Sequence, residues 1–581
     1  MKQITLSISY QVSQVEDSYI KRFIYLLSMH KCVNVTIYNC VKYISSLCLQ
    51  CYFLYGKVGE IEKGGSFMKL KKMKLLTIAL VSLLVLTACG SKGSDGGDGG
   101  FKDTLTLASG ADAITFDIQA TNTQSTTRIA RQIYETLIFQ GDDLKLSPGL
   151  AESWEAVDDT TYEFKLKKDV KFHNGEPFTA KDVAYTLNRA SESKDIGHIV
   201  GAIDPGKIKI VDDYTIQIGT TAPYGPFLTH LAHPATGIMN EKAVTEGGED
   251  YGIKPVGTGP YKLDNWITGS EITIKAFDDY HGEKPATPTI VFKVILEEDT
   301  RLIALENGEI DIALDVSPND VAKVEGNDDL KLYRDQNLST AYIGFNVASK
   351  TPISDPKVRQ AISHAVDVDS IIKTIYQGVG TKAVGPVNSL VFGYNDKLKP
   401  YEYDMDKAKE LLAEAGYADG FTFKFYVGNN NSQRISTAEV IKESLSKLNI
   451  TVEISQLEWG AFLEASANGE SDMFALGWTT VTTDADYGLY PLFHSDQFGA
   501  AGNRSFYKND RVDELLTGAK TETDPEKRKA MYFEAQEIIT TDAPWIFIQS
   551  GEDVIGASVK VDGFNNNPVG SYYLNSVTVK K

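Results

Sequence analysis

The chain contains 581 residues with 58 basic and 78 acidic side chains, which gives a formal net charge of −20. Hydrophobic residues make up 42% and charged residues 23%, an ordinary globular composition that excludes a wholly disordered, collagen-like or coiled-coil protein. The excess of acidic residues argues against nucleic acid as the main partner, because binding to phosphates requires a basic surface. All five cysteines lie within the first 89 residues, so disulfides, cysteine nucleophiles and Cys-ligated zinc are excluded from the following 492 residues.

The segment that ends at Cys89 has the features of a signal peptide. Four lysines from Lys69 to Lys74 precede an uncharged, mostly apolar stretch of 14 residues, Leu75–Ala88. This stretch is too short to span a hydrocarbon core of about 30 Å, but it suits the hydrophobic region of a signal peptide. Its last residues, with Cys89, form the sequence Leu-Thr-Ala-Cys, which resembles a bacterial lipobox. We therefore predict a lipoprotein signal peptide at 68–88, then a lipidated Cys89 and a flexible, glycine-rich tether at 89–100.

The residues before this signal peptide have two interpretations. Lys63-Gly64-Gly65 can be encoded by a purine-rich ribosome-binding sequence at a suitable distance before Met68. We therefore expect translation to start at Met68, and residues 1–67 to be a translated upstream region outside the protein proper. The alternative is a zinc site that combines the CxxC pair Cys48 and Cys51 with two further cysteines, Cys32 and Cys40, although no glycine-rich knuckle surrounds the pair.

The charge distribution supports a boundary near Cys89. Residues 1–67 carry a formal charge of +3 and residues 68–88 carry +4, so residues 89–581 carry −27. An acidic body behind a lipid anchor is expected outside the cytoplasm, held at the outer face of the cell membrane by Cys89. No later segment approaches 18 continuous apolar residues, so the chain is not expected to be a permease.

Strand and helix patterns alternate through the rest of the chain. Apolar and polar residues alternate, as in half-buried strands, at 104–107, 162–166, 207–210, 214–218, 271–275 and 421–425. Helical spacing appears at 180–188, 301–306, 358–375, 405–415, 436–448 and 526–540. Gly416 suits the end of the fourth of these helices, and Asp524-Pro525 suits the start of the last. The alternation predicts an α/β fold, strand-rich from Phe101 to Phe292 and more helical later, which favours at least two lobes.

Enzyme motifs are missing from the sequence. It contains neither an HExxH zinc motif nor a GxSxG nucleophile elbow. His230 and His233 have a spacing that could ligate a metal, but Pro234 follows at once and no carboxylate lies nearby in sequence, so we interpret the pair as structural. The glycine-rich stretch Gly257–Pro260 lacks the lysine of a phosphate-binding loop and favours a tight turn. We therefore predict a binding protein without a cofactor or metal rather than an enzyme.

A series of motifs keeps a fixed order between about residues 101 and 565. They lie at 134–137 (YETL), 150–154 (LAESW), 169–183 (DVKFHNGEPFTAKDV), 256–261 (VGTGPY), 278–282 (DDYHG), 308–311 (GEID), 342–346 (YIGFN), 358–367 (VRQAISHAVD), 406–417 (DKAKELLAEAGY) and 503–516. The set resembles the bacterial family-5 solute-binding proteins of ABC importers, which bind oligopeptides, dipeptides, glutathione or nickel chelates. The resemblance implies an α/β, two-lobed periplasmic-binding-protein-like fold of type II, in its large cluster C form, with mixed sheets and an extra subdomain in lobe one.

The same resemblance implies a domain organisation and a mechanism. Lobe one would comprise residues 101–345, with the extra subdomain at about 145–295, and lobe two residues 346–544, while residues 545–581 return to lobe one. The lobes would close on a ligand because it binds the closed form more tightly. The liganded monomer would then meet a membrane permease that is served by separate ATPase subunits.

The ligand region is expected at Gly477–Phe493. Hydroxyls and carboxylates follow Trp478 in this run, and two tyrosines come next, which suits a wet cleft for polar, peptide-like ligands. A surface loop between a strand and a helix is the alternative interpretation. The candidate ligand-binding residues are Trp478, Thr479, Thr480, Thr482, Asp484, Asp486 and Tyr487, with Asn346 from one of the family motifs.

The identity of the ligand is expected from details of this run. Dipeptide and oligopeptide binders carry an aspartate three residues after the tryptophan, where it pairs with the ligand ammonium; here that position is Val481, so Asp484 or Asp486 is expected to take the role. The pattern T-x-x-T-x-A-D followed by L-x-P-L-F more closely resembles glutathione-binding members. Glutathione or a related γ-glutamyl peptide is therefore the expected ligand. A nickel chelate or a general di- or oligopeptide is the alternative within the family, and a surface chaperone or adhesin is a remote one.

A ligand of this kind carries two carboxylates and one ammonium group, so its site needs a cation. The fork of an arginine matches a carboxylate in bidentate fashion. Arg504 and Arg434 are the candidates, and Arg128 is a weaker third. On this basis Asp484→Ala or Arg504→Ala is expected to weaken ligand binding by about 1.5–3 kcal/mol.

Overall fold

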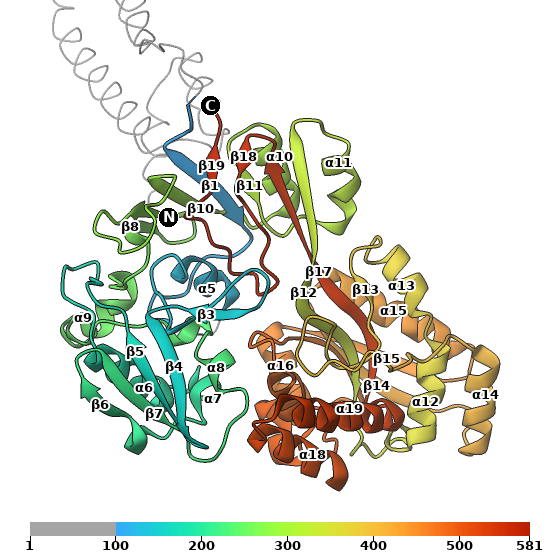
Figure 1. Ribbon diagram of the computed structural model, residues 1–581. Helices are drawn as coiled ribbons and strands as arrows, with labels where there is room; N and C mark the ends of the chain where they lie inside the picture. Colours follow the sequence, from blue (N-terminus) through green and yellow to red (C-terminus); the bar gives the residue numbers. More distant parts are fainter. Residues whose placement is uncertain (1–99, 122) are drawn as a thin grey trace, which may run out of the picture. The chain divides into compact units, whose positions relative to one another are not determined.

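The structure, a computed structural model, describes residues 100–121 and 123–581 (Figure 1). The predicted upstream region, the signal peptide and the lipidation site at Cys89 lie outside the described residues. Within them, no helix has the length and apolar character that crossing a membrane requires.

One large sheet extends through the described chain, in the strand order β15-β14-β16-β12-β17-β11-β1-β10-β9-β8, with β13 paired to β17 beside this path. Its strands are β1 (Thr104–Ser109), β8 (Tyr261–Ile267), β9 (Glu271–Ala276), β10 (Thr289–Val294), β11 (Ile312–Ala313), β12 (Leu330–Phe345), β13 (Thr381–Lys382), β14 (Thr422–Gly428), β15 (Thr451–Leu457), β16 (Met473–Thr479) and β17 (Trp545–Ser558). The sheet contains both parallel pairs, such as β1–β10 and β14–β15, and antiparallel pairs, such as β9–β10 and β12–β16. The predicted α/β class with mixed sheets is confirmed.

The two longest strands, β12 and β17, hold the sheet together. They pair antiparallel from Leu330 opposite Ser558 to Gly344 opposite Trp545, with a register shift between Gln336 and Thr340 (Figure 1). Near one end β17 also pairs with β11, and near the other end β12 also pairs with β16. The predicted lobe boundaries at 345 and 545 fall at the ends of these strands, and the division itself stays a prediction.

The predicted extra subdomain contains a second sheet, which is antiparallel and ordered β4-β5-β7-β6. The strands are β4 (Ala151–Asp158), β5 (Thr161–Leu166), β6 (Lys209–Asp212) and β7 (Thr215–Gly219), and the short hairpin β2 (Ile138–Gln140) and β3 (Leu146–Pro148) precedes them. Helix α6 (Ala180–Glu192) begins at a capping box formed by Thr179 and Asp182. Its apolar face, which includes Val183 and Leu187, belongs to the same buried cluster as Phe164 of β5. The shorter helices α7 (Gly197–Val200), α8 (Phe227–His230) and α9 (Glu241–Gly247) complete this part.

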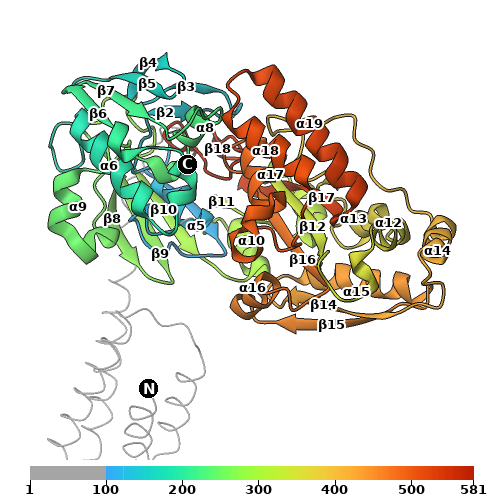
Figure 2. The same cartoon turned by 90° about the horizontal axis from the view of Figure 1, so that it is seen from below.

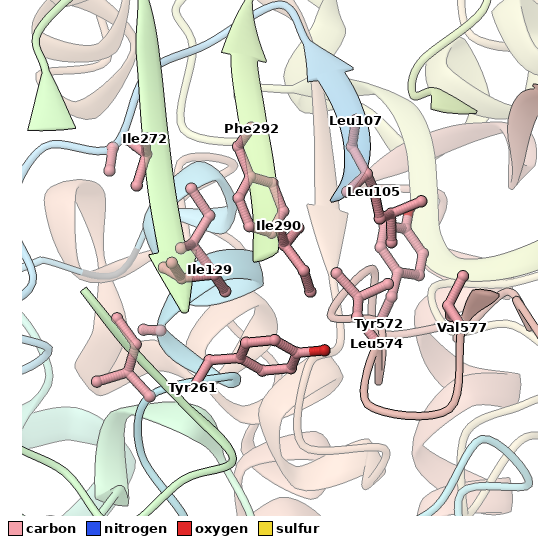
Figure 3. Close-up of a cluster of buried hydrophobic side chains, with 14 of the residues drawn as sticks. Leu105, Leu107, Ile129, Tyr261, Ile272, Ile290, Phe292, Tyr572, Leu574 and Val577 are labelled. Carbon is pink, nitrogen blue, oxygen red and sulfur yellow. The ribbon is translucent and has the colours of Figure 1, made fainter. Parts of the chain in front are cut away.

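The core beside β1 combines the start and the end of the described chain. In β1 the residues alternate, so that Leu105 and Leu107 point into one buried cluster. Figure 3 shows this cluster, which includes residues of β10, of α5 (Gln124–Ala130) and of the C-terminal segment after β17 (559–581). Its labelled residues include Ile129, Ile290, Phe292, Tyr572, Leu574 and Val577. The C-terminal segment therefore completes the core that the first strand begins.

Helices dominate the chain after β12, as the sequence predicts. Figure 2 shows β14 and β15 side by side at the edge of the sheet, with α15 alongside them. The predicted helix at 358–375 is interrupted at Val366, because the Asp367 side chain accepts a hydrogen bond from the Ser370 amide and starts a new helix. The helices after β12 are α12 (Pro356–Ala365), α13 (Val368–Thr374), α14 (Met405–Glu414), α15 (Ser432–Ser446), α16 (Trp459–Ala467), α17 (Ala485–Phe493), α18 (Asp510–Thr521) and α19 (Pro525–Asp542), while α10 (Glu298–Glu306) and α11 (Val321–Glu325) precede it.

Candidate functional site

Two cavities meet at the end of β16 and share Gly477, Trp478 and Thr479. The larger has a volume of about 370 Å³ and is lined mainly by β12, β17 and the start of α15. The smaller has a volume of about 250 Å³ and is lined by α5, Tyr487 and the C-terminal segment. The structure therefore places four predicted site residues along these two adjoining cavities: Trp478, Thr479, Tyr487 and Arg434.

The aromatic side chains of this region are fixed by local contacts. The Trp478 indole nitrogen donates a hydrogen bond to the Tyr487 carbonyl oxygen at 3.0 Å, and the two rings lie 5.3 Å apart. Trp478 lies opposite Thr340 in the register of β16 and β12. The tryptophan is thus held between a central strand and α17, and its half-buried ring forms part of both cavity walls.

Arg434 is the basic residue that lines the larger cavity. It lies in the first turn of α15, where the Asn431 side chain accepts a hydrogen bond from the Arg434 amide. Its guanidinium lies 5.9 Å from the Trp459 ring and has no ion pair with any acidic residue that the structure describes. Burial lowers the pKa of this guanidinium from its ordinary value. A half-buried arginine without an ion pair, beside a cavity, is suited to bind the carboxylate of a ligand.

Four acidic residues line the same cavity, and sequence reasoning missed all of them: Glu298, Asp315, Glu552 and Asp553. Glu552 forms an ion pair with Arg334 and accepts a hydrogen bond from the Gly380 amide. Asp315 has a left-handed backbone, with φ of 54°, and its carboxylate lies 3.6 Å from the Arg128 guanidinium. In the sequence, the adjacent pair Glu552 and Asp553 could have indicated this acidic wall, because two neighbouring charges are unusual in a strand that is otherwise mostly buried.

Asp553 has an unusual environment. Its Oδ1 accepts a hydrogen bond from the Asn337 side-chain amide at 2.7 Å, while Oδ2 is buried without a partner among the described residues. Burial, together with Asp315 and Asp335, raises the pKa of the Asp553 carboxyl to about 6, against the opposing effects of Asn337 and Arg128. Asp553 therefore lines the cavity and has one buried oxygen without a partner among the described residues.

The predicted ammonium anchor Asp484 is engaged within the protein instead. Its two oxygens accept hydrogen bonds from Arg528 Nη2 at 2.8 and 2.9 Å, and it also accepts one from the Asp486 amide as the N-cap of α17. Asp484 is 2% exposed and lines neither cavity that meets at Trp478. The geometry gives this buried ion pair a structural role.

Asp486 faces a third cavity, of about 320 Å³, that Tyr487 also lines. Its Oδ2 accepts a hydrogen bond from the Tyr224 hydroxyl at 2.9 Å, and Oδ1 has no partner among the described residues. His230 lies beside Tyr224 at 2.9 Å and contacts the Ile199 carbonyl oxygen through its other ring nitrogen. This arrangement joins the predicted extra subdomain to α17.

The remaining predicted residues support loops rather than the two cavities that meet at Trp478. The Arg504 guanidinium donates hydrogen bonds to Leu463 and Ser466 of α16, and burial lowers its pKa from the ordinary value. The Asn346 side chain donates to the Gly469 and Ser471 carbonyl oxygens. Thr480 and Thr482 are buried in the turn that precedes α17, where Thr483 has a left-handed backbone with φ of 59°.

The two histidines whose spacing could ligate a metal, His230 and His233, form hydrogen bonds within the protein. The described residues include no group of three or more His, Cys, Asp or Glu side chains that could hold a metal ion. His230 contacts Tyr224, and the His233 Nδ1 accepts a hydrogen bond from the Ala235 amide.

Known proteins resemble this chain in sequence and in fold. The chain is 34% identical over 470 residues to the glutathione-binding protein GsiB of Pectobacterium atrosepticum, with 79% of this chain and 90% of the relative covered. It is 31% identical to GsiB of Escherichia coli O157:H7, with 79% and 91% covered. Among solved structures, DppA of Helicobacter pylori in complex with the peptide STSA is similar with a TM-score of 0.73 and 32% identity, covering 83% of this chain and 99% of that one.

A further solved structure, AppA of Bacillus subtilis in complex with a nonapeptide, matches with a TM-score of 0.71 and 27% identity, covering 82% of this chain and 99% of that one. These likenesses confirm the predicted two-lobed fold of periplasmic binding proteins. The family model for bacterial extracellular solute-binding proteins, family 5 Middle, matches residues 145–500. The chain therefore belongs to the family-5 bacterial extracellular solute-binding proteins.

Proposed function

We propose that this protein captures glutathione or another short γ-glutamyl-type peptide outside the cytoplasm and delivers it to the permease of an ABC importer. The observation that supports this most is the unpaired Arg434 guanidinium in a cavity whose remaining charged residues are acidic. A cavity with a cation on one wall and carboxylates on another matches a zwitterionic ligand. The names of the curated relatives, which are glutathione-binding proteins, support the choice of ligand.

Closure of the lobes has a physical basis in contacts between the two predicted lobes. The Gln140 side-chain amide donates to Thr483 Oγ1 at 3.0 Å, and the Tyr224 hydroxyl donates to Asp486. The Gly225 amide donates to the Lys520 carbonyl oxygen at 3.1 Å. A ligand that touches both Arg434 and the acidic residues of β17 would favour the closed form through its differential affinity.

The cellular setting follows from the sequence and from the family. Lipidation of Cys89 would keep the binding protein at the outer face of the membrane, close to the permease. ATP would be hydrolysed by separate ATPase subunits, so the chain itself would contribute binding and delivery.

A thermal-shift and calorimetry screen of the purified protein tests the proposal. The panel is glutathione, glutathione disulfide, di- to pentapeptides and nickel–histidine. A ligand at 100 times its dissociation constant should stabilise the protein by about 2.7 kcal/mol. Stabilisation by glutathione alone would support the γ-glutamyl ligand. A shift only with ordinary peptides, or only with nickel–histidine, would contradict it and assign the protein to another branch of the family.

A further inference from the structure

The acidic wall of the larger cavity has an excess of negative charge. Glu552 is neutralised by Arg334, and Arg128 lies 3.6 Å from Asp315. Asp553 has no ion pair of its own, since its Oδ1 accepts from the neutral Asn337 amide. Glu298 has no ion pair either, so two carboxylate charges at this wall are left without a matched cation in the described chain.

The unpartnered oxygen of Asp553 is costly in the free protein. A buried polar atom without a hydrogen bond loses its interaction with water and gains nothing in return, which costs more when the atom belongs to a charged group. Oδ2 of Asp553 is such an atom, and the residue lines the cavity. A cationic donor from a ligand would remove this cost.

The opposite subsite lies at a short distance along β12. A Cβ atom added to Gly477 would lie 3.1 Å from Arg434 Nη2 and 3.3 Å from the Thr340 carbonyl oxygen, so this guanidinium lies beside Thr340. Asp553 contacts Asn337. Asn337 and Thr340 are three positions apart in β12, across the register shift, so at 3.3–3.6 Å per residue these two backbone positions lie at most roughly 10 Å apart. An extended tripeptide has about this length.

We propose that Asp553, with Asp315 beside it, forms the subsite for the ammonium group of the ligand whose carboxylate binds to Arg434. This rests on the proposed function and makes it more specific: the ligand is a short peptide with a free ammonium group, bound between β17 and α15. The sequence favoured Asp484 and Asp486 for this role. Asp484 is engaged with Arg528, and Asp486, although one of its oxygens also has no partner in the described chain, lines a different cavity from Arg434. Long peptides and N-blocked peptides would bind poorly.

The test pairs a variant with a modified ligand. Calorimetry measures binding of glutathione and of N-acetylglutathione, which lacks the ammonium charge, to the wild-type protein and to Asp553→Asn. The wild-type protein should prefer glutathione roughly 10- to 100-fold, as expected for a charge-assisted hydrogen bond. Asp553→Asn should lose most of this preference while still binding N-acetylglutathione through Arg434. The α-linked tripeptide Glu-Cys-Gly shows whether the subsite requires the γ-linkage.

Asp335→Asn is the matched control. Asp335 lies opposite Asp553 in the β12–β17 register and is exposed, so the substitution removes the same charge from a position outside the cavity lining. It should keep the preference for glutathione. Thermal unfolding of each variant confirms that it is folded.

The outcomes separate the two proposals. If Asp553→Asn keeps the full preference for glutathione, or if Asp335→Asn loses it equally, the ammonium subsite is overturned and the proposed function stands. If the wild-type protein binds neither glutathione nor any other peptide of the panel, the proposed function fails and the subsite fails with it.

Discussion

The turn after Trp478 and the strand pair β12–β17 differ in whether their aspartates have partners within the protein. In the turn, Asp484 is satisfied by Arg528 and by the start of α17. In the strand pair, Asp553 lines a cavity and has one buried oxygen without a partner among the described residues. The comparison shows that the polar residues that follow a tryptophan can have their hydrogen bonds within the protein, where they stabilise a turn. A carboxylate in a strand that lines a cavity, in contrast, can lack an ion pair within the described chain and can therefore interact with a ligand.

The largest expected effect is on stability, and it tests the structural role of Asp484 in the turn. Asp484→Ala leaves the Arg528 guanidinium buried without its partner, which should lower the free energy of unfolding by about 3–5 kcal/mol. Chemical denaturation measures this loss. The double variant Asp484→Ala/Arg528→Ala should lose less than the sum of the single variants. Unchanged stability together with weakened glutathione binding would instead restore Asp484 as the ligand anchor that the sequence predicts.

Arg434→Ala should weaken binding of glutathione by roughly 10- to 100-fold, because it removes the cation available to the ligand carboxylate. The melting temperature should change little, since this guanidinium has no ion pair to lose in the described chain. Arg504→Ala is the control, because Arg504 holds α16 through Leu463 and Ser466. It should lower the melting temperature and leave calorimetric affinity within a few-fold. The reverse pattern would move the carboxylate subsite to Arg504.

The pH dependence of ligand binding tests the role of Asp553 in the strand pair. The Asp553 carboxyl has a pKa of about 6 in the free protein, where Arg128, Asp315, Asp335, Asn337 and Tyr572 surround it. A ligand ammonium binds the ionised form, so affinity should be full above about pH 7 and fall up to about tenfold per pH unit below 6.

Calorimetry of glutathione from pH 5 to pH 8 measures this dependence. N-acetylglutathione should show no such fall, and Asp553→Asn should remove it for glutathione. A pH profile that is the same for both ligands in the wild-type protein would contradict the assignment.

The smallest expected effect concerns the space beside Arg434. The Cβ of a Gly477→Ala variant would lie within 3.1 Å of Arg434 Nη2 and 3.3 Å of a backbone oxygen, so the guanidinium must shift by a few tenths of an ångström. We expect glutathione affinity to fall about two- to tenfold, because a bidentate contact tolerates little displacement. Binding titrations of Gly477→Ala, run in parallel with Arg434→Ala, measure this loss of glutathione affinity. Full affinity in this variant would show that Arg434 adapts freely.

Local pattern predicted much of the secondary structure. Alternation at 104–107, 271–275 and 421–425 corresponds to β1, β9 and β14, and Gly416 follows α14 with φ of 84°. The prediction was wrong where a side chain overrides periodicity, as at Asp367, which starts α13 inside the predicted helix at 358–375. For the site, Trp478, Thr479, Tyr487 and Arg434 line the two cavities, and their role in ligand binding stays a prediction.

The sequence by itself determined the family, the α/β class and the acidic character, because these depend on composition, periodicity and motif order along the chain. The choice among its charged residues was decided only by tertiary structure. Asp553 and Arg434 face one cavity because β12 pairs with β17 on one side and with β16 on the other. Whether a carboxylate is available to a ligand depends on which partners folding brings to it, and Arg528 reaches Asp484 from a helix 44 positions away.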